Sequence, residues 1–146
     1  MKEIVINQNW EEEIDPVTAG EDAARFIESR DFSPNRKKEI EPLIKVLIEA
    51  IQFGYVIVND DDSITQKFRK PICNSDGKAV LENLKYEARV KTGAINDAMQ
   101  KLQPHTAVAQ IVTYASIHTG KPIEIINKVN SGYDRTVLES ISTLFF

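Results

Sequence analysis

The spacing of apolar residues changes at Gly54, and this change limits the folds that the chain can adopt. Between Lys37 and Phe53, apolar side chains recur every three or four residues, which is the period of one face of an α-helix. From Tyr55 onward they alternate with polar residues, which is the period of a strand. A glycine at this position suits the left-handed conformation that often ends a helix. The sequence therefore predicts a helix followed directly by a sheet.

Three segments after Gly54 carry strand signals and are joined by sequences typical of turns. The segments YVIV and SITQKF are separated by the acidic turn NDDD, and the turn NSDGK precedes AVLENLKYEARV. In the second segment Ile64, Gln66 and Phe68 lie on one face, so the pattern has a period of two. These features predict an antiparallel three-stranded meander over residues 55–90.

Helical patterns on both sides of the meander complete a single domain of residues 1–146. Residues 19–54 and 91–146 are predicted to be helical, the latter forming a C-terminal helical part with breaks at Gly120 and Gly132. Residues 1–18 contain an acidic run and are predicted to be a mobile or loosely packed arm, with Thr18 as the cap of the first helix. The predicted class is α+β, mostly helical with a small meander.

The composition excludes several broad classes of function. With 22 acidic and 18 basic residues the net charge is -4, which argues against bulk affinity for nucleic acid or anionic membranes. The apolar stretches are far shorter than the roughly 20 residues that span a bilayer. The N-terminal sequence lacks the apolar core of a signal peptide, and the single cysteine suits a reducing compartment. We therefore expect a cytoplasmic protein without membrane association.

Sequence signals for catalysis and cofactor binding are weak. The six glycines stand singly, so no phosphate-binding loop is predicted, and the run of aspartates after Asn59 fits a solvated turn better than a calcium loop. A nucleophilic pair of Cys73 with His105 or His118 is the remaining enzymatic alternative. A partly buried, satisfied imidazole is the better interpretation of His118. We predict no enzyme, metal site or cofactor.

A cluster of basic residues on or beside the predicted hairpin offers a second hypothesis. A helix followed by a hairpin is the outline of a winged helix, a class of DNA-binding regulatory proteins. The helix over residues 37–53 carries three glutamates beside Lys45 on its polar face, which disfavours entry into a DNA groove. Salt-sensitive binding would support this alternative. The candidate basic patch consists of Lys67, Arg69, Lys70 and Lys78.

The chain from Gly54 to its last residue resembles a known protein family. The segment GYVIVNDDDSITQKFRKPI, the DGK turn and LENLKYEARV look like the central signature of tail assembly chaperones of long-tailed bacteriophages, particularly the Mu-like group. The segment YASIHTGKPIEIINKVNSGYDRTVLESISTLFF is similar to their closing pattern, which ends in a helix with two phenylalanines. The first 50 residues carry no part of the resemblance.

The resemblance implies a non-enzymatic protein of a phage or prophage, present in the host cytoplasm. Such a chaperone binds the long helical tape-measure protein during tail morphogenesis, and we expect it to self-associate. Binding an amphipathic helix requires exposed apolar surface. For any single one of the candidate residues, ordinary core packing is the better interpretation. The candidate partner-binding residues are Tyr133, Leu138, Ile141, Leu144, Phe145 and Phe146.

Overall fold

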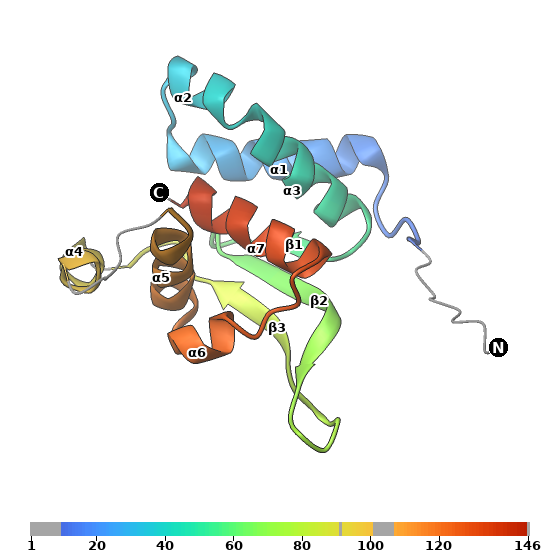
Figure 1. The fold of residues 1–146 in the computed structure, drawn as a ribbon. Coiled ribbons are helices and arrows are strands. Elements are labelled where there is room, and N and C mark those ends of the chain that lie inside the picture. The colour runs from blue at the N-terminus through green and yellow to red at the C-terminus, as the bar shows by residue number, and fades with distance from the viewer. Residues whose placement is uncertain (1–9, 91, 101–106, 146) are drawn as a thin grey trace.

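The computed structural model describes residues 10–90, 92–100 and 107–145. These residues form seven helices and one three-stranded antiparallel sheet, which confirms the predicted α+β class (Figure 1). Helices α1 to α3 cover one side of α7, and the sheet lies on its other side. The elements are α1 (Pro16–Arg30), α2 (Pro34–Glu39), α3 (Glu41–Gln52), β1 (Val56–Val58), β2 (Ile64–Cys73), β3 (Ala79–Tyr86), α4 (Thr92–Gln100), α5 (Ala107–Thr119), α6 (Ile123–Ile126) and α7 (Tyr133–Leu144).

Helix α1 begins inside the segment that was predicted to be an arm. Its cap is Asp15 rather than Thr18, because the Asp15 carboxylate accepts hydrogen bonds from the backbone N–H groups of Val17 and Thr18, each at 3.0 Å. The hydrogen bonds from Thr18 lower the pKa of the Asp15 carboxyl group. Pro16 fits the first helical position, where a missing N–H costs nothing.

The predicted helix over residues 37–53 is divided at Ile40. Helix α2 ends at Glu39, and Ile40 has φ −95° and ψ 4°, outside the helical range, before α3 begins. Pro42 explains the division, because it has no N–H to donate and restricts the residues before it. Gly54 has φ +80° and follows the end of α3, as the sequence predicted.

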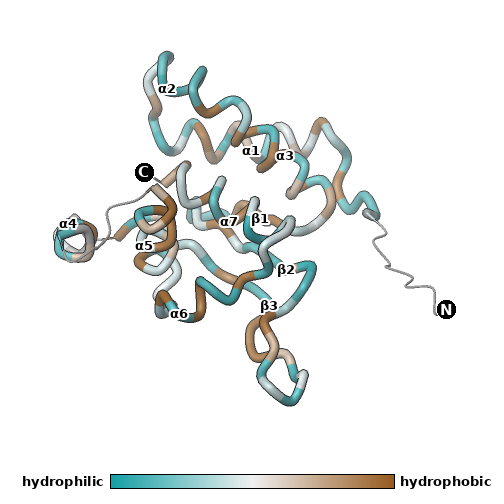
Figure 2. Tube along the Cα trace, viewed as in Figure 1, coloured by the Kyte–Doolittle hydropathy of each residue, from teal (hydrophilic) through white to brown (hydrophobic). Residues whose placement is uncertain are grey.

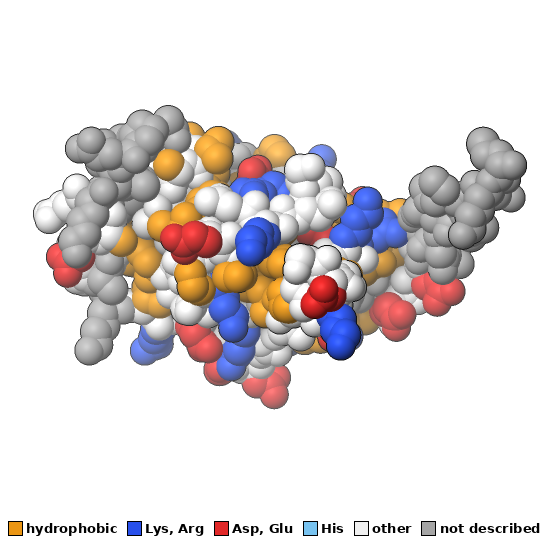
Figure 3. All heavy atoms as spheres, turned by 60° about the horizontal axis from the view of Figure 1, so that its bottom comes forward, with side chains coloured by type: hydrophobic (Ala, Val, Ile, Leu, Met, Phe, Trp, Pro, Cys, Tyr) orange, Lys and Arg blue, Asp and Glu red, His pale blue; other side chains and the backbone are white. Residues whose placement is uncertain are grey.

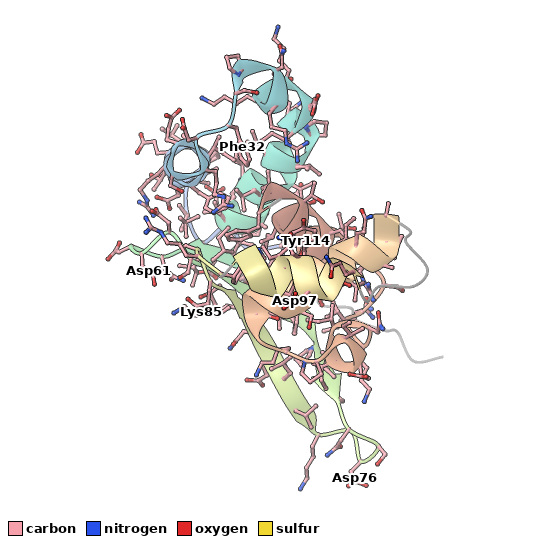
Figure 4. The ribbon with its side chains drawn as sticks, turned by 90° about the vertical axis from the view of Figure 1, so that its left-hand side faces the viewer. Phe32, Asp61, Asp76, Lys85, Asp97 and Tyr114 are labelled. Carbon is pink, nitrogen blue, oxygen red and sulfur yellow. The ribbon has the colours of Figure 1, made fainter. Side chains whose placement is uncertain are left out.

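The sheet has the strand order β1-β2-β3, which confirms the predicted meander. Val56 pairs with Gln66, and Ile64 pairs with Tyr86. Side chains of β2 alternate between buried and less buried positions from Ile64 to Phe68, as the period of two predicted. Beyond Lys67 the register shifts, and the distal ends of β2 and β3 project away from the helices as a hairpin with Asp76 at its tip (Figures 1 and 4).

Helix α7 lies at the centre of the fold and packs against α3, α5 and β2. The predicted breaks before it are present, since Gly120 adopts a positive φ of 70° after α5 and Gly132 precedes α7. Helix α4 begins at Thr92, and residues 101–106 between α4 and α5 lie outside the described residues. The apolar stripe of α7 is buried from Val137 to Leu144.

One hydrophobic core joins the helices to the inner face of the sheet. Figure 2 shows that apolar and polar segments are interleaved along the helices. No helix among the described residues has the length and apolar content needed to cross a bilayer. The largest fully buried side chains include Tyr86, Phe26, Leu47, Leu138 and Ile141.

A buried polar bridge connects α7 to β2 where the strand register shifts. The Asp134 carboxylate, only 2% exposed, accepts hydrogen bonds from the backbone N–H groups of Arg69 at 2.8 Å and Lys70 at 2.9 Å. The Gln66 amide donates to the Asp134 carbonyl oxygen at 2.9 Å and accepts from the Tyr86 hydroxyl at 2.6 Å. Asp134 thus satisfies two backbone donors where the regular pairing with β3 is interrupted.

Candidate functional site

The residues predicted to bind a partner are mostly part of the core. Leu138 and Leu144 are fully buried, Ile141 is almost so, and Phe145 is 3% exposed. The structure thus shows core packing for these residues, because the apolar stripe of α7 packs against other elements of the same chain, and their binding to a partner stays a prediction. Tyr133 is half-buried and belongs to the site described below, and Phe146 lies outside the described residues.

The residues of the predicted basic patch do not form one continuous surface. Lys67 and Arg69 lie on β2, where Arg69 stacks on aromatic rings, whereas Lys70 lies in the register shift and Lys78 in the turn of the projecting hairpin. On the face shown in Figure 3, lysine and arginine side chains are scattered among apolar and acidic ones. These residues were predicted to form a patch because they are close in sequence. In the structure they lie at different positions along the hairpin.

Four aromatic rings meet where residues 10–15 pack against the ends of α3 and α7, and we call them the aromatic platform. Trp10 makes edge-to-face contacts with Phe53, Tyr55 and Tyr133, with ring centroids 5.4, 5.5 and 4.7 Å apart, respectively. Tyr55 and Tyr133 contact each other at 5.8 Å. Edge-to-face pairs of this kind add favourable energy beyond the burial of their area. Trp10 remains 38% exposed, so the platform is accessible from solvent.

The backbone holds residues 10–15 against the domain. The N–H groups of Glu13 and Ile14 both donate to the Gln52 carbonyl oxygen at the end of α3, at 2.9 and 3.1 Å. Residues 10–15 of the predicted arm are therefore packed against the domain. Residues 1–9 lie outside the described residues. Gly54 adjoins this contact, since a Cβ atom there would lie 2.7 Å from the Glu13 side chain. The packing of residues 10–15 beside the platform therefore requires the small residue Gly54 at the end of α3.

Arg69 completes the aromatic platform with a positive charge. Its guanidinium carbon lies 3.9 Å from the centre of the Trp10 ring and 5.4 Å from that of Tyr55. Cation–π contacts at this range favour a fixed guanidinium position. The backbone of Arg69 is held separately by Asp134, so two independent contacts orient this residue.

A pocket of about 520 Å³ opens beside the platform. Glu11 and Glu13 contribute carboxylates to its lining, and Lys67 contributes an ammonium group. None of these three side chains forms an ion pair with a described residue. The pocket therefore combines an apolar lining with charges of both signs that remain available to a ligand. Its other lining residues are Ile14, Phe53, Gly54, Tyr55, Val56, Ile57 and Phe68.

The Tyr133 hydroxyl group is buried in the platform without a hydrogen-bond partner. Burial raises the pKa of Tyr133, and the nearby Glu49 raises it further. The hydroxyl is therefore protonated at neutral pH. It provides one donor and one acceptor in a region otherwise made of aromatic carbon.

Cys73 and His118 do not form a catalytic pair in this structure. Cys73 is exposed near the turn of the projecting hairpin, whereas His118 is 3% exposed beneath Phe145, whose ring centroid is 4.6 Å away. The His118 Nδ1 atom lies 3.1 Å from the Glu87 carbonyl oxygen, which can only accept, so Nδ1 carries the proton. The imidazole is buried as predicted, but it is satisfied only at Nδ1, because the buried Nε2 atom has no hydrogen-bond partner among the described residues. His105 lies outside the described residues.

Stability is expected to fall on acidification because of His118. Burial lowers its pKa below the ordinary value of 6.5, and the positive charge of Arg30 lowers it further. The unfolded chain then binds a proton more readily than the folded chain, so stability contributed by neutral His118 is lost as the pH falls below 6.5. Urea unfolding from pH 7.5 to 5 measures this loss.

The variant His118→Gln provides the control for this pH dependence. It removes the titrating group while its side-chain amide can still donate to the Glu87 carbonyl oxygen. We expect a shallower decline of unfolding free energy with falling pH than in the natural chain. Equal slopes for the two proteins would assign the pH dependence to other groups.

Neither comparison with known proteins nor the described side chains assigns a chemical activity to this chain. No group of three or more histidine, cysteine, aspartate or glutamate side chains suited to a metal ion occurs among the residues that the structure describes. No protein-family model, curated protein or solved structure matches the chain. The candidate site therefore depends on the geometry of the aromatic platform and its pocket.

Sequence reasoning missed Trp10, which lies next to the acidic run in the predicted arm. A usable signal was present, because a large aromatic side chain is rarely left free when it can contact a core. The same argument applies to Phe145 at the other end of the chain, which is buried. The partner rings at Phe53, Tyr55 and Tyr133 come from distant segments, so no local pattern predicts the cluster.

Proposed function

We propose that the chain is a non-enzymatic tail assembly chaperone of a phage or prophage that binds the tape-measure protein during tail morphogenesis. The proposal rests on the family resemblance together with one structural observation, the solvent-accessible aromatic platform. We also propose that the protein acts in the host cytoplasm and associates with copies of itself.

The composition of the platform supports a protein-binding role. Tryptophan, tyrosine and arginine are the side chains that most often dominate the energy of protein interfaces. Trp10, Tyr55, Tyr133 and Arg69 bring these types together, beside a pocket with an apolar lining. The partner surface is therefore proposed at the platform and not on the buried stripe of α7.

The alternative of a winged-helix DNA-binding protein gains no support from the geometry. Helix α3, which would have to enter the DNA groove, packs against both α1 and α7. Leu47, Ala50 and Ile51 of this helix are buried, and its first turn begins with Glu41. The basic residues of the hairpin are dispersed, as described above. DNA binding stays a prediction to be examined by retention on DNA at rising salt.

Co-expression with the tape-measure protein of the same phage or prophage tests the proposal. We expect the tape-measure protein to become more soluble and to co-purify with the tagged chain. In the variant Trp10→Ala, loss of the central ring of the platform is expected to weaken co-purification about tenfold or more, as for an interface residue that dominates binding. The yield of the complex and its dissociation constant are the measurements.

The variant Val108→Ala is the matched control, because Val108 is exposed on α5, outside the platform. It should bind like the natural chain, and thermal unfolding should show that both variants are folded. Failure of the natural chain to solubilise or bind the tape-measure protein would refute the chaperone proposal. Normal binding by a folded Trp10→Ala variant would instead place the interface elsewhere.

A further inference from the structure

We propose that Arg69 is a recognition site for a carboxylate, supplied by an aspartate or glutamate side chain on a partner segment whose neighbouring apolar residue enters the pocket. The inference concerns the chemistry of the segment that the platform accepts. It rests on the proposed protein-binding role, but its test does not require the tape-measure protein.

The Arg69 side chain is positioned but its hydrogen-bonding capacity is unused. The Arg69 guanidinium carbon lies 3.9 Å from the centre of the Trp10 ring, and this cation–π contact does not pair the N–H donors with a hydrogen-bond acceptor. Arg69 forms no ion pair or side-chain hydrogen bond with any residue that the structure describes. A planar fork of donors held in this way matches the two oxygens of a carboxylate.

Lys67 provides a second cation near Arg69. It lies two residues earlier on β2 and lines the pocket, so its ammonium group adds positive charge beside the platform. The site therefore offers one fixed guanidinium and one flexible cation to a carboxylate.

The acidic residues of the pocket restrict which carboxylates are accepted. Glu11 and Glu13 also line the pocket, and their charge is opposite to that of Lys67. Their carboxylates repel a strongly acidic segment. A segment in which one carboxylate is accompanied by a basic residue satisfies both signs. The apolar lining, which includes Ile14 and Phe53, accommodates a leucine-sized side chain of the same segment. An amphipathic helix with alternating charges has this pattern.

A matched pair of peptides tests the carboxylate requirement on the full chain. The probes are the capped peptides Leu-Glu-Ala-Leu-Lys and Leu-Gln-Ala-Leu-Lys, which differ only in the carboxylate. Trp10 is the single tryptophan of the chain, so its fluorescence reports directly on the platform. We expect saturable binding of the glutamate peptide and about fivefold weaker binding of the glutamine peptide, as for an arginine–carboxylate pair at a partly exposed site.

The variant Arg69→Gln is expected to bind both peptides equally and weakly. Its backbone N–H is retained, so the contact with Asp134 and the fold are preserved. Arg89→Gln is the control, because Arg89 is exposed and lies beyond β3, outside the platform and pocket. It should preserve the preference for the glutamate peptide. Unfolding curves verify that each variant is folded.

Equal affinity of the natural chain for the two peptides, including no measurable binding of either, would overturn the carboxylate assignment. A preference that survives in Arg69→Gln would also overturn it. The tape-measure experiment is separate, so a failure of either proposal can be recognised independently. A glycine peptide that is capped only at its N-terminus keeps a free C-terminal carboxylate. It is expected to bind less tightly than the glutamate peptide, because it has no apolar side chain for the pocket.

Discussion

Replacing Phe145 with alanine is expected to lower the free energy of unfolding by about 3–5 kcal/mol, the usual cost of removing a buried phenylalanine ring. The ring lies 5.4 Å from that of Phe26 and 6.2 Å from that of Tyr86, and it stacks on His118. The Arg30 guanidinium carbon lies 4.8 Å from its centre. Removing the ring therefore creates a cavity and leaves a half-buried cation without its aromatic contact. Urea unfolding monitored by circular dichroism measures the effect.

Two other variants serve as controls for the loss of stability in Phe145→Ala. Phe145→Leu retains apolar volume and should cost less than the alanine variant, because the cavity is smaller. Val108→Ala removes a largely exposed side chain and should change stability by no more than about 0.5 kcal/mol. A loss below about 1 kcal/mol for Phe145→Ala would contradict the close packing around this ring.

Replacing Asp134 with alanine is expected to destabilise the protein by about 3 kcal/mol, because two partly buried backbone donors lose a buried, charged acceptor. These donors are the backbone N–H groups of Arg69 and Lys70, at 2.8 and 2.9 Å from the carboxylate. They lie in the register shift of β2, and Pro71 follows directly with no N–H of its own. The free energy of unfolding in urea is the measurement.

Asparagine at position 134 separates geometry from hydrogen bonding. Asp134→Asn keeps the shape, but its amide nitrogen faces one of the two backbone N–H groups, so we expect an intermediate loss of stability. Asp76→Asn, at the exposed tip of the hairpin, should have almost no effect (Figure 4). Equal stability of Asp134→Ala and the natural chain would show that water or a rearranged strand satisfies these donors.

The sequence predicted the elements whose residues are neighbours along the chain. The meander followed from the period of two after Gly54 and from its turn sequences, and all three strands are present. The apolar stripe around Leu138 and Ile141 was also recognised, and these residues are buried. Periodicity indicates which face of a helix is apolar, but it does not say what covers that face. The structure shows that the same chain covers this stripe, and its binding to a partner stays a prediction.

The candidate site was not predictable in the same way, because its contacts connect distant segments. Trp10 meets Tyr133 across most of the chain, and Asp134 was not recognised as the acceptor for the backbone of Arg69. Gln66 was predicted to share a face with Ile64 and Phe68, but its hydrogen bonds with Asp134 and Tyr86 depend on the tertiary packing. Such pairings leave no periodic signal in one sequence.

The central position of α7 also sets the order in which the chain can fold. The Asp134 contacts close loops of 65 and 64 residues, and the Arg30 hydrogen bond to the Phe145 carbonyl oxygen spans 115 residues. Closing such loops costs entropy before the contacts form, whereas α1, α3 and the meander rely on nearer neighbours. We therefore expect α1, α3 and the meander to be more structured than α7 in the folding transition state, with docking of α7 as a late event.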